Sequence, residues 1–351
     1  RLLAELERRA GRSGLLTAVV ADHGEGLGDH GERTHGFQLY DSTLRVPMIV
    51  HGPGVAPAVV RDPVSVVDLA PTLLALPGVA PGGGGGSVGI GGVDLLSSGA
   101  PRSPVAFEAC HPYHSYGWSP LFGLVRGADK WIDGPTPELY DVVADPREDD
   151  ERSAAVPAVA RSMRAALREL GARHGPSERI ALDASHAEEL RSLGYAGSAP
   201  HADALPPLPP GTPVPVLPDG LERLDPKHGL HLYDTCQEAL ALAGRGRPGD
   251  LRRAVELVDD LLAHDPANPS FLAHASSVLL TAGEYERAAR AARASLDLLD
   301  TPSARTNLAS SLYHTGRGGE ALALLEETVL VHPFHLLTRL QLAGALADAQ
   351  R

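Results

Sequence analysis

The sequence predicts an α/β domain containing part of a doubly wound sheet and a small antiparallel subdomain, followed by an all-α solenoid. Three observations support this. Short apolar runs alternate with helical patterns over residues 1–80, as in sheets covered by helices. Short strand-like segments separated by polar or glycine turns occupy residues 104–142. From about residue 229 the pattern is helical throughout and repeats itself.

The first elements fit a sheet that is buried on both faces. Residues 2–10 have helical spacing and contain no helix breaker. Residues 15–21 (LLTAVVA) and 46–50 (VPMIV) are continuous apolar runs. Runs of this length are typical of strands covered on both sides, as in a parallel sheet. We therefore expect two buried strands here.

A helix is expected to follow at DLAPTLLALPGV. Asp68 is the expected N-cap, Pro71 falls in the tolerated first turn, and Pro77-Gly78 ends the helix. Farther along, residues 153–173 and 185–193 have helical patterns. The glycine run at residues 82–86 indicates a surface loop.

The domain prediction places the α/β part at residues 1–196, a Pro-rich linker at 197–228 and helical repeats at 229–351. Ala288 and Ala321 occupy matching positions 33 residues apart, each after a glycine turn, and Ala254 lies 34 residues before Ala288. This period is typical of stacked helix pairs and resembles tetratricopeptide repeats. An unrelated helical bundle is the alternative.

Composition excludes several classes of protein. The 351 residues carry a net charge of −13, which argues against a nucleic-acid or anionic-membrane partner. Two cysteines exclude a disulfide framework. No run of 18 apolar residues occurs, so no transmembrane segment is expected. The chain begins with Arg1, and we expect a fragment or a processed chain. Localisation stays open, with an extracytoplasmic or periplasmic site among the options.

Asp22 and His23 directly follow the first expected strand, and Gly24 and Gly26 allow close approach of the backbone. Ligands of open α/β sheets bind beyond the carboxyl ends of the strands. A carboxylate and an imidazole at that place can supply half of a metal site.

Two further histidines follow in the same glycine-rich segment. An anionic ester needs a cation on one oxygen and neutralising donors on the others. Asp22 and His23 are the candidate metal ligands, and His35, if protonated, can contact the anionic group or the leaving oxygen. His30 is expected to support the site from behind or to serve the fold. A polar loop with unrelated histidines is the alternative.

These residues carry a resemblance to the sulfatases of the alkaline phosphatase superfamily, specifically to the C-terminal part of their catalytic domain. The matching motifs are Asp22-His23-Gly24-Glu25, Leu27-Gly28-Asp29-His30-Gly31, His35-Gly36, Leu39-Tyr40-Asp41, Leu44-Arg45-Val46-Pro47, Gly52-Pro53-Gly54, Val67-Asp68-Leu69-Ala70-Pro71-Thr72-Leu73-Leu74 and, later, Glu138-Leu139-Tyr140-Asp141 with Asp145-Pro146. EELRSLGY followed by helical repeats resembles bacterial sulfatases joined to tetratricopeptide repeats. The resemblance covers nearly all of residues 1–196.

The resemblance implies roles for three side chains. Asp22 and His23 would bind one divalent metal, usually Ca²⁺, with Mn²⁺, Mg²⁺ and Zn²⁺ as alternatives. His35 would bind the transferred group as a catalytic and substrate-binding residue. The family's nucleophile is a formylglycine made in a Cys/Ser-x-Pro/Ala-x-Arg motif, which this chain lacks. Cys110 and Cys236 are expected to be inert thiols.

The resemblance therefore implies metal-dependent hydrolysis of sulfate esters, with a sulfated small molecule or glycan as substrate. Hydrolysis of phosphodiesters or phosphonates, or phosphoethanolamine transfer, is the alternative within the superfamily. A non-catalytic interaction module, with a protein partner bound by the repeats, is the alternative of another class. The chain by itself is expected to be inactive. His111, His114 and Trp118 would either approach the substrate or serve ordinary packing.

Overall fold

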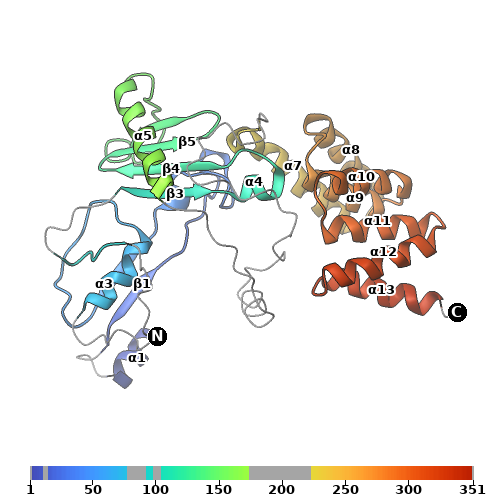
Figure 1. Ribbon diagram of the computed structural model, residues 1–351, viewed down its shortest axis with the longest axis horizontal. Coiled ribbons are helices and arrows are strands. Elements are labelled where there is room, and N and C mark those ends of the chain that lie inside the picture. The colour runs from blue at the N-terminus through green and yellow to red at the C-terminus, as the bar shows by residue number, and fades with distance from the viewer. Residues whose placement is uncertain (1, 11–14, 77–91, 98–103, 174–222, 350–351) are drawn as a thin grey trace. The chain divides into compact units, whose positions relative to one another are not determined.

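The computed structural model describes residues 2–10, 15–76, 92–97, 104–173 and 223–349 (Figure 1). The described residues form two compact units. Residues 2–109 and 120–173 belong to the first unit, and residues 110–119 and 223–349 belong to the second. The expected helix at 185–193 and most of the expected linker lie outside the described residues. An α/β part followed by a helical repeat part confirms the expected fold class.

The first sheet differs from the expectation. Strand β1 (Thr17–Val20) pairs with β2 (Met48–His51) in antiparallel register, with Val20 opposite Met48. Val19 is 42% exposed and Ile49 57% exposed. The prediction of parallel, fully buried strands was wrong for the described residues. An apolar run indicates that a strand tends to be buried, but it does not indicate the direction of the neighbouring strand.

The helices that precede β1 and follow β2 in the chain mostly follow the sequence pattern. Helix α1 spans Leu2–Ala10 as expected. The 3₁₀ turn η2 (Val66–Asp68) leads into helix α3 (Leu69–Ala75). Asp68 lies at the N-cap position of α3 as expected, but its side chain makes no capping hydrogen bond to that helix. Ser65 caps η2, since the Ser65 hydroxyl accepts the Val67 N–H while the Asp68 carboxylate accepts the Ser65 N–H. The reciprocal pair is a capping box.

The expected small antiparallel sheet is confirmed. Its strands follow one another in the order β3-β4-β5-β6, with the bounds Val105–Ala109, Leu121–Arg126, Asp129–Asp133 and Glu138–Asp141. Helix α5 (Pro157–Arg173) covers one face, where Trp131 packs with Met163. Ile132, the next residue along β5, packs instead with Leu39 and Tyr40, because successive side chains of a strand point to opposite faces. The sheet thus lies under the segment that follows the candidate site.

The second unit contains helix pairs at the expected period. Its long helices are α7 (Pro226–Arg245), α8 (Pro248–His264), α9 (Pro269–Thr281), α10 (Tyr285–Leu298), α11 (Pro302–His314), α12 (Gly318–Val331) and α13 (Leu336–Ala349). The matching residues Ala254, Ala288 and Ala321 are at most 1% exposed. They lie where neighbouring helices pack closely, and a small side chain allows that approach. Helix α7 begins at Pro226, and the domain boundaries stay a prediction. None of the helices in the described part of the chain combines the length and hydropathy needed to cross a bilayer.

Candidate functional site

The loop after β1 is held by close backbone contacts at its glycines. The N–H of Gly24 donates to Thr43 O (2.7 Å), and that of Gly26 donates to Thr34 O (2.7 Å). A Cβ atom on Gly24 would lie 2.2 Å from Ser42 O, and one on Gly26 would lie 2.3 Å from Glu32 O. Only glycine tolerates approaches this short. The loop therefore folds back on itself and returns residue 35 to the neighbourhood of residue 23.

The rings of His23 and His35 stack at this place. Their centroids are 3.7 Å apart and their planes are inclined by 25°. His35 Nδ1 lies 3.2 Å from a Glu25 carboxylate oxygen. The side chains of His23, Glu25 and His35 are each 43–44% exposed. The structure thus brings together three predicted site residues, since Asp22 adjoins His23, and adds Glu25 as a partner of His35.

The hydrogen bonds of His23 define its tautomer. Nδ1 lies 2.8 Å from the carbonyl oxygen of Gly24, which can only accept, so Nδ1 carries the proton. In the neutral ring the lone pair is then on Nε2, which lies 3.7 Å from an Asp22 carboxylate oxygen. A metal-binding histidine needs this arrangement, with one nitrogen oriented by a carbonyl and the other available as a ligand.

These donors fit half of a cation site. Carboxylate and imidazole are ligands of divalent metals, and Asp22 and His23 present one oxygen and one nitrogen near each other. No cluster of three or more His, Cys, Asp or Glu side chains suited to a metal ion occurs in the described part of the chain. Asp22 and His23 therefore stay the candidate ligands that the sequence predicts.

His30 contacts the scaffold. Its ring stacks on Tyr40 with 3.6 Å between centroids, and its Nε2 lies 3.0 Å from Glu148 O. The backbone of His30 has φ +46°, which is unusual for a residue with a side chain. These contacts link the loop to the segment after β6. The expected supporting role of His30 at the site stays a prediction.

Two buried carboxylates that the sequence analysis did not single out hold the loop. Glu32 is 2% exposed and accepts the N–H groups of Phe37 (2.9 Å) and Gln38 (3.0 Å). Burial raises the pKa of Glu32. Glu148 is 3% exposed and accepts the Asp41 N–H at 2.6 Å. Glu148 lies more than a hundred residues from the loop, so local sequence patterns carry no signal for this contact.

Lys130 completes the support beneath the loop. Its side chain is fully buried, and Nζ lies 2.7 Å from Asp41 and 2.6 Å from Glu148. Burial raises the pKa of Glu148, opposed by the nearby lysine. A buried charge needs such partners. Lys130 lies on β5, so these ion pairs link the end of the candidate loop to the antiparallel sheet.

The other residues noted in the sequence lie in the second unit. Trp118 follows helix α4 (His111–Tyr116) and is 2% exposed, with its indole N–H donating to Asp265 at 3.1 Å. Trp118 therefore serves packing. Cys236 is 1% exposed, and burial raises the pKa of its thiol to about 12, as expected for an inert thiol.

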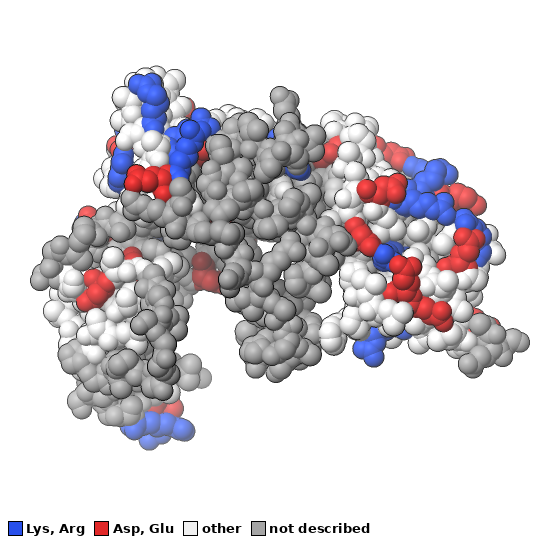
Figure 2. Space-filling model, viewed as in Figure 1, with Lys and Arg blue, Asp and Glu red and all other residues white. Residues whose placement is uncertain are grey.

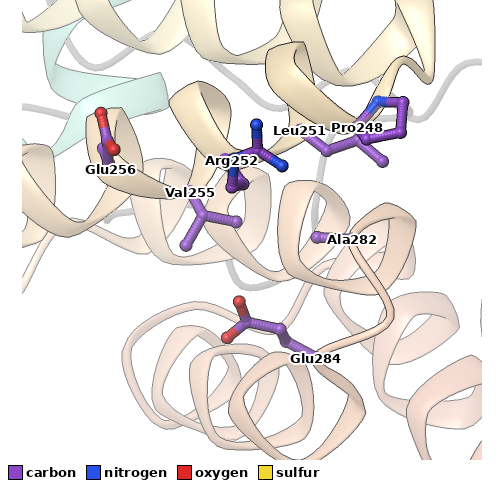
Figure 3. A pocket seen from close by; sticks show the side chains of 7 residues that line it. All are labelled: Pro248, Leu251, Arg252, Val255, Glu256, Ala282 and Glu284. Atoms are coloured by element: carbon purple, nitrogen blue, oxygen red, sulfur yellow. The ribbon is translucent and has the colours of Figure 1, made fainter.

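A separate hollow of about 420 Å³ lies in the second unit (Figure 3). It is formed by helix α8 and the turn between α9 and α10, and its lining residues are Pro248, Leu251, Arg252, Val255, Glu256, Ala282 and Glu284. The lining contains an arginine, two carboxylates and apolar side chains, but none of the candidate site residues. We assign no reaction to it.

Comparison with known proteins agrees with the motifs. Residues 1–79 match the family model "Sulfatase". The chain is 29% identical over 149 residues to a Δ4,5-hexuronate-2-O-sulfatase of Bacteroides thetaiotaomicron, covering 40% of this chain and 30% of that protein. It is 30% identical over 140 residues to a choline-sulfatase of Rhizobium meliloti, covering 38% of this chain and 26% of that protein. The resemblance to sulfatases is thus confirmed for the N-terminal part.

The matches cover only part of each relative. The chain spans about a third or less of the length of these two curated relatives. Among solved structures, the chain is similar to the Sgt2 TPR domain from Aspergillus fumigatus, with 18% identity, a TM-score of 0.31, and coverage of 34% of this chain and 80% of that one.

Proposed function

We propose that the whole protein containing this chain is a sulfatase that hydrolyses sulfate esters with the help of a divalent cation. The observation that carries the proposal is the meeting of Asp22, His23 and His35 in the part of the chain that matches the sulfatase family model. The substrate class proposed is a sulfated small molecule or glycan.

Each of these side chains has a distinct proposed task. Asp22 and His23 would hold the cation, with Ca²⁺ as the first candidate and Mn²⁺, Mg²⁺ and Zn²⁺ as alternatives. When bound, the cation neutralises negative charge on an ester oxygen. His35 Nδ1 faces the Glu25 carboxylate, and His35, if protonated, would donate a hydrogen bond from Nε2 to the sulfate group or to the leaving oxygen.

The glycine contacts and the buried supports are proposed to hold these groups in place. Gly24 and Gly26 keep the loop against Thr43 and Thr34, and Glu32 holds the chain after His35. Positioning before reaction lowers the reorganisation needed in the transition state. We assign the nucleophile to neither cysteine of this chain, and the formylglycine implied by the resemblance would come from another part of the whole protein.

The test is an assay of the whole protein on an aryl sulfate and, in parallel, on an aryl phosphodiester. We expect hydrolysis of the sulfate, loss of activity on chelation, and a fall in kcat/KM of at least about 100-fold in Asp22→Ala and in His35→Ala. His51→Ala is the matched control, because His51 lies opposite Thr17 at the other end of the strand pair.

Two results would contradict this assignment. Hydrolysis of the phosphodiester in preference to the sulfate would favour the alternative within the superfamily. Full activity in Asp22→Ala and His35→Ala would remove these residues from the site, even if the protein is a sulfatase.

The helical repeats supply a surface for a protein partner in this proposal. Stacked helix pairs present extended faces that suit protein docking.

A further inference from the structure

The segment Cys110–Ser119 connects strands β3 and β4, yet it belongs to the second unit together with the repeats. It leaves the sheet after Ala109, forms the short helix α4, and returns to the sheet at Pro120. Figure 1 shows α4 beside α7. We call this ten-residue segment the α4 segment.

Two aromatic side chains of the α4 segment are buried against first helices of the repeat pairs. Tyr116 is 8% exposed and lies edge-on to Tyr233 of α7, with 6.0 Å between ring centroids. It also lies 5.5 Å from the ring of Phe271 on α9. Trp118 stacks on Tyr116 at 5.0 Å. Buried Tyr and Trp are the side chains that dominate binding energy at protein interfaces.

Helix α7 has a glycine where the indole of Trp118 sits. A Cβ atom on Gly229 would lie 2.6 Å from the Trp118 ring. Glycine in a helix interior is unfavourable relative to alanine, so this position favours the fit of Trp118 over the stability of the helix. The absence of a side chain at Gly229 therefore leaves the space on α7 that the indole of Trp118 occupies.

Polar groups of the second unit bind the backbone of the α4 segment. Asn268 Nδ2 donates to Tyr116 O (2.8 Å) and to Asp265 (2.9 Å), while Asp265 also accepts the Trp118 indole N–H. The Ser270 hydroxyl donates to Ser115 O, and Arg223 donates to Gly117 O at 2.7 Å. Asn268 is 1% exposed and also caps α9 through its Oδ1. Main-chain recognition with aromatic anchors is how grooves bind peptides.

We propose that the face formed by α7 and the start of α9 is a peptide-binding groove whose ligand is the chain's own α4 segment. The first part of the repeat unit then recognises the connection between two strands of the sulfatase-like sheet, and a foreign partner has to use other parts of the solenoid. The proposal concerns a different surface from the candidate catalytic site and does not depend on the proposed reaction.

The test uses the full chain with a protease recognition sequence inserted within residues 197–220. After cleavage, the N-terminal fragment carries the α4 segment and the C-terminal fragment carries the repeats. We expect the two fragments to stay together in size-exclusion chromatography at about 1 μM, because buried aromatic anchors dominate binding.

The most informative substitution is in α7, on the side of the groove that belongs to the repeats. Gly229→Ala should weaken the association of the cleaved fragments at least about tenfold, while alanine favours the helix itself, so that loss of folding does not explain the result. Gly244→Ala in the same helix is the matched control, because a Cβ atom there meets nothing within 4 Å. Trp118→Ala should weaken association from the other side, and His114→Ala, at an exposed position, should not.

The proposal is overturned if the unmodified fragments separate after cleavage. It is also overturned if Gly229→Ala leaves association as strong as Gly244→Ala does, since contacts elsewhere would then hold the fragments together. Circular dichroism of each cleaved variant checks that the helices are retained.

Discussion

Lys130 is the residue on which the support of the candidate site converges. It is one of two lysines in the chain, and its side chain is fully buried between Asp41 and Glu148. Glu148 in turn accepts hydrogen bonds from the site loop through both its carboxylate and its carbonyl group. These contacts join three segments that are distant in sequence.

Lys130→Met should lower the free energy of unfolding by about 3 kcal/mol, because it leaves two carboxylates near each other without their cation. Urea denaturation followed by circular dichroism measures this loss. Arg45→Met, at an exposed position, is the control and should change stability by less than about 0.5 kcal/mol. A loss of less than about 1 kcal/mol in Lys130→Met would show that the buried ions contribute little.

Asp133 gives the fold a pH dependence. It is 2% exposed at the end of β5, with Arg164 Nε at 3.2 Å. Burial raises the pKa of its carboxyl group from 3.8 to about 6. Between pH 3.8 and about 6 the folded chain therefore keeps a proton on Asp133 that the unfolded chain releases. The contribution of Asp133 to the unfolding free energy is full below pH 3.8 and is lost as the pH rises to about 6.

Asp133→Asn should remove this dependence. Relative to the unmodified chain, the unfolding free energy of the variant should increase by on the order of 2 kcal/mol between about pH 4 and pH 7. Urea denaturation at a series of pH values measures the difference between the two proteins, which cancels the other titrating groups. A difference that stays constant with pH would contradict the assignment.

At the scale of the elements, the turns within the helix pairs depend on glycine. Gly283 and Gly316 follow the first helices of two successive pairs and have φ values of +81° and +80°. The repeat of this conformation at a spacing of 33 residues is the structural basis of the period seen in the sequence. A side chain at such a position strains the backbone.

Gly316→Ala should destabilise the repeat unit by about 1 kcal/mol. A Cβ atom there meets nothing within 4 Å, so the loss measures backbone strain alone. Gly344→Ala, within α13 and equally without a neighbour, should stabilise by about 0.5–1 kcal/mol, because alanine is the better helix former. Thermal denaturation compares the two, and equal effects would exclude the conformational explanation.

The whole molecule contains at least two separate hydrophobic cores, one between α5 and the antiparallel sheet and others within the helix pairs. The surface is acidic overall, with a net charge of −13. On the face of the repeats seen in Figure 2, acidic and basic side chains are interspersed. Arg287 and Asp259 form one ion pair at the surface of the repeats. Exposed pairs of this kind add little stability. The hydrophobic cores therefore contribute most of the stability of the fold.

Separate cores should unfold in separate transitions. Scanning calorimetry of the full chain should show two heat-absorption peaks. Gly316→Ala should lower the midpoint of one peak, and Lys130→Met should lower the midpoint of the other. A single peak that both substitutions shift equally would show that the units unfold together.

The sequence predicted those features that depend on neighbours in the chain. The helix at residues 2–10, the first three strands of the small antiparallel sheet, the repeat period and the adjacency of Asp22 and His23 all follow from local spacing. The same reasoning was wrong about the direction and burial of β1 and β2, because these depend on which strand lies opposite. Asp68 lies at the N-cap position of α3 as predicted, but its carboxylate accepts the N–H of Ser65 and makes no capping hydrogen bond to α3.

The sequence by itself determined the periodicity of the helices and the chemical groups of the candidate loop, because backbone preferences and side-chain spacing act over a few residues. Only the tertiary structure decided that His23 stacks on His35, that Lys130 joins Asp41 to Glu148, and that Trp118 is seated against Gly229. Those pairs lie from twelve to more than a hundred residues apart, and contacts at such separations form only when the whole chain has packed.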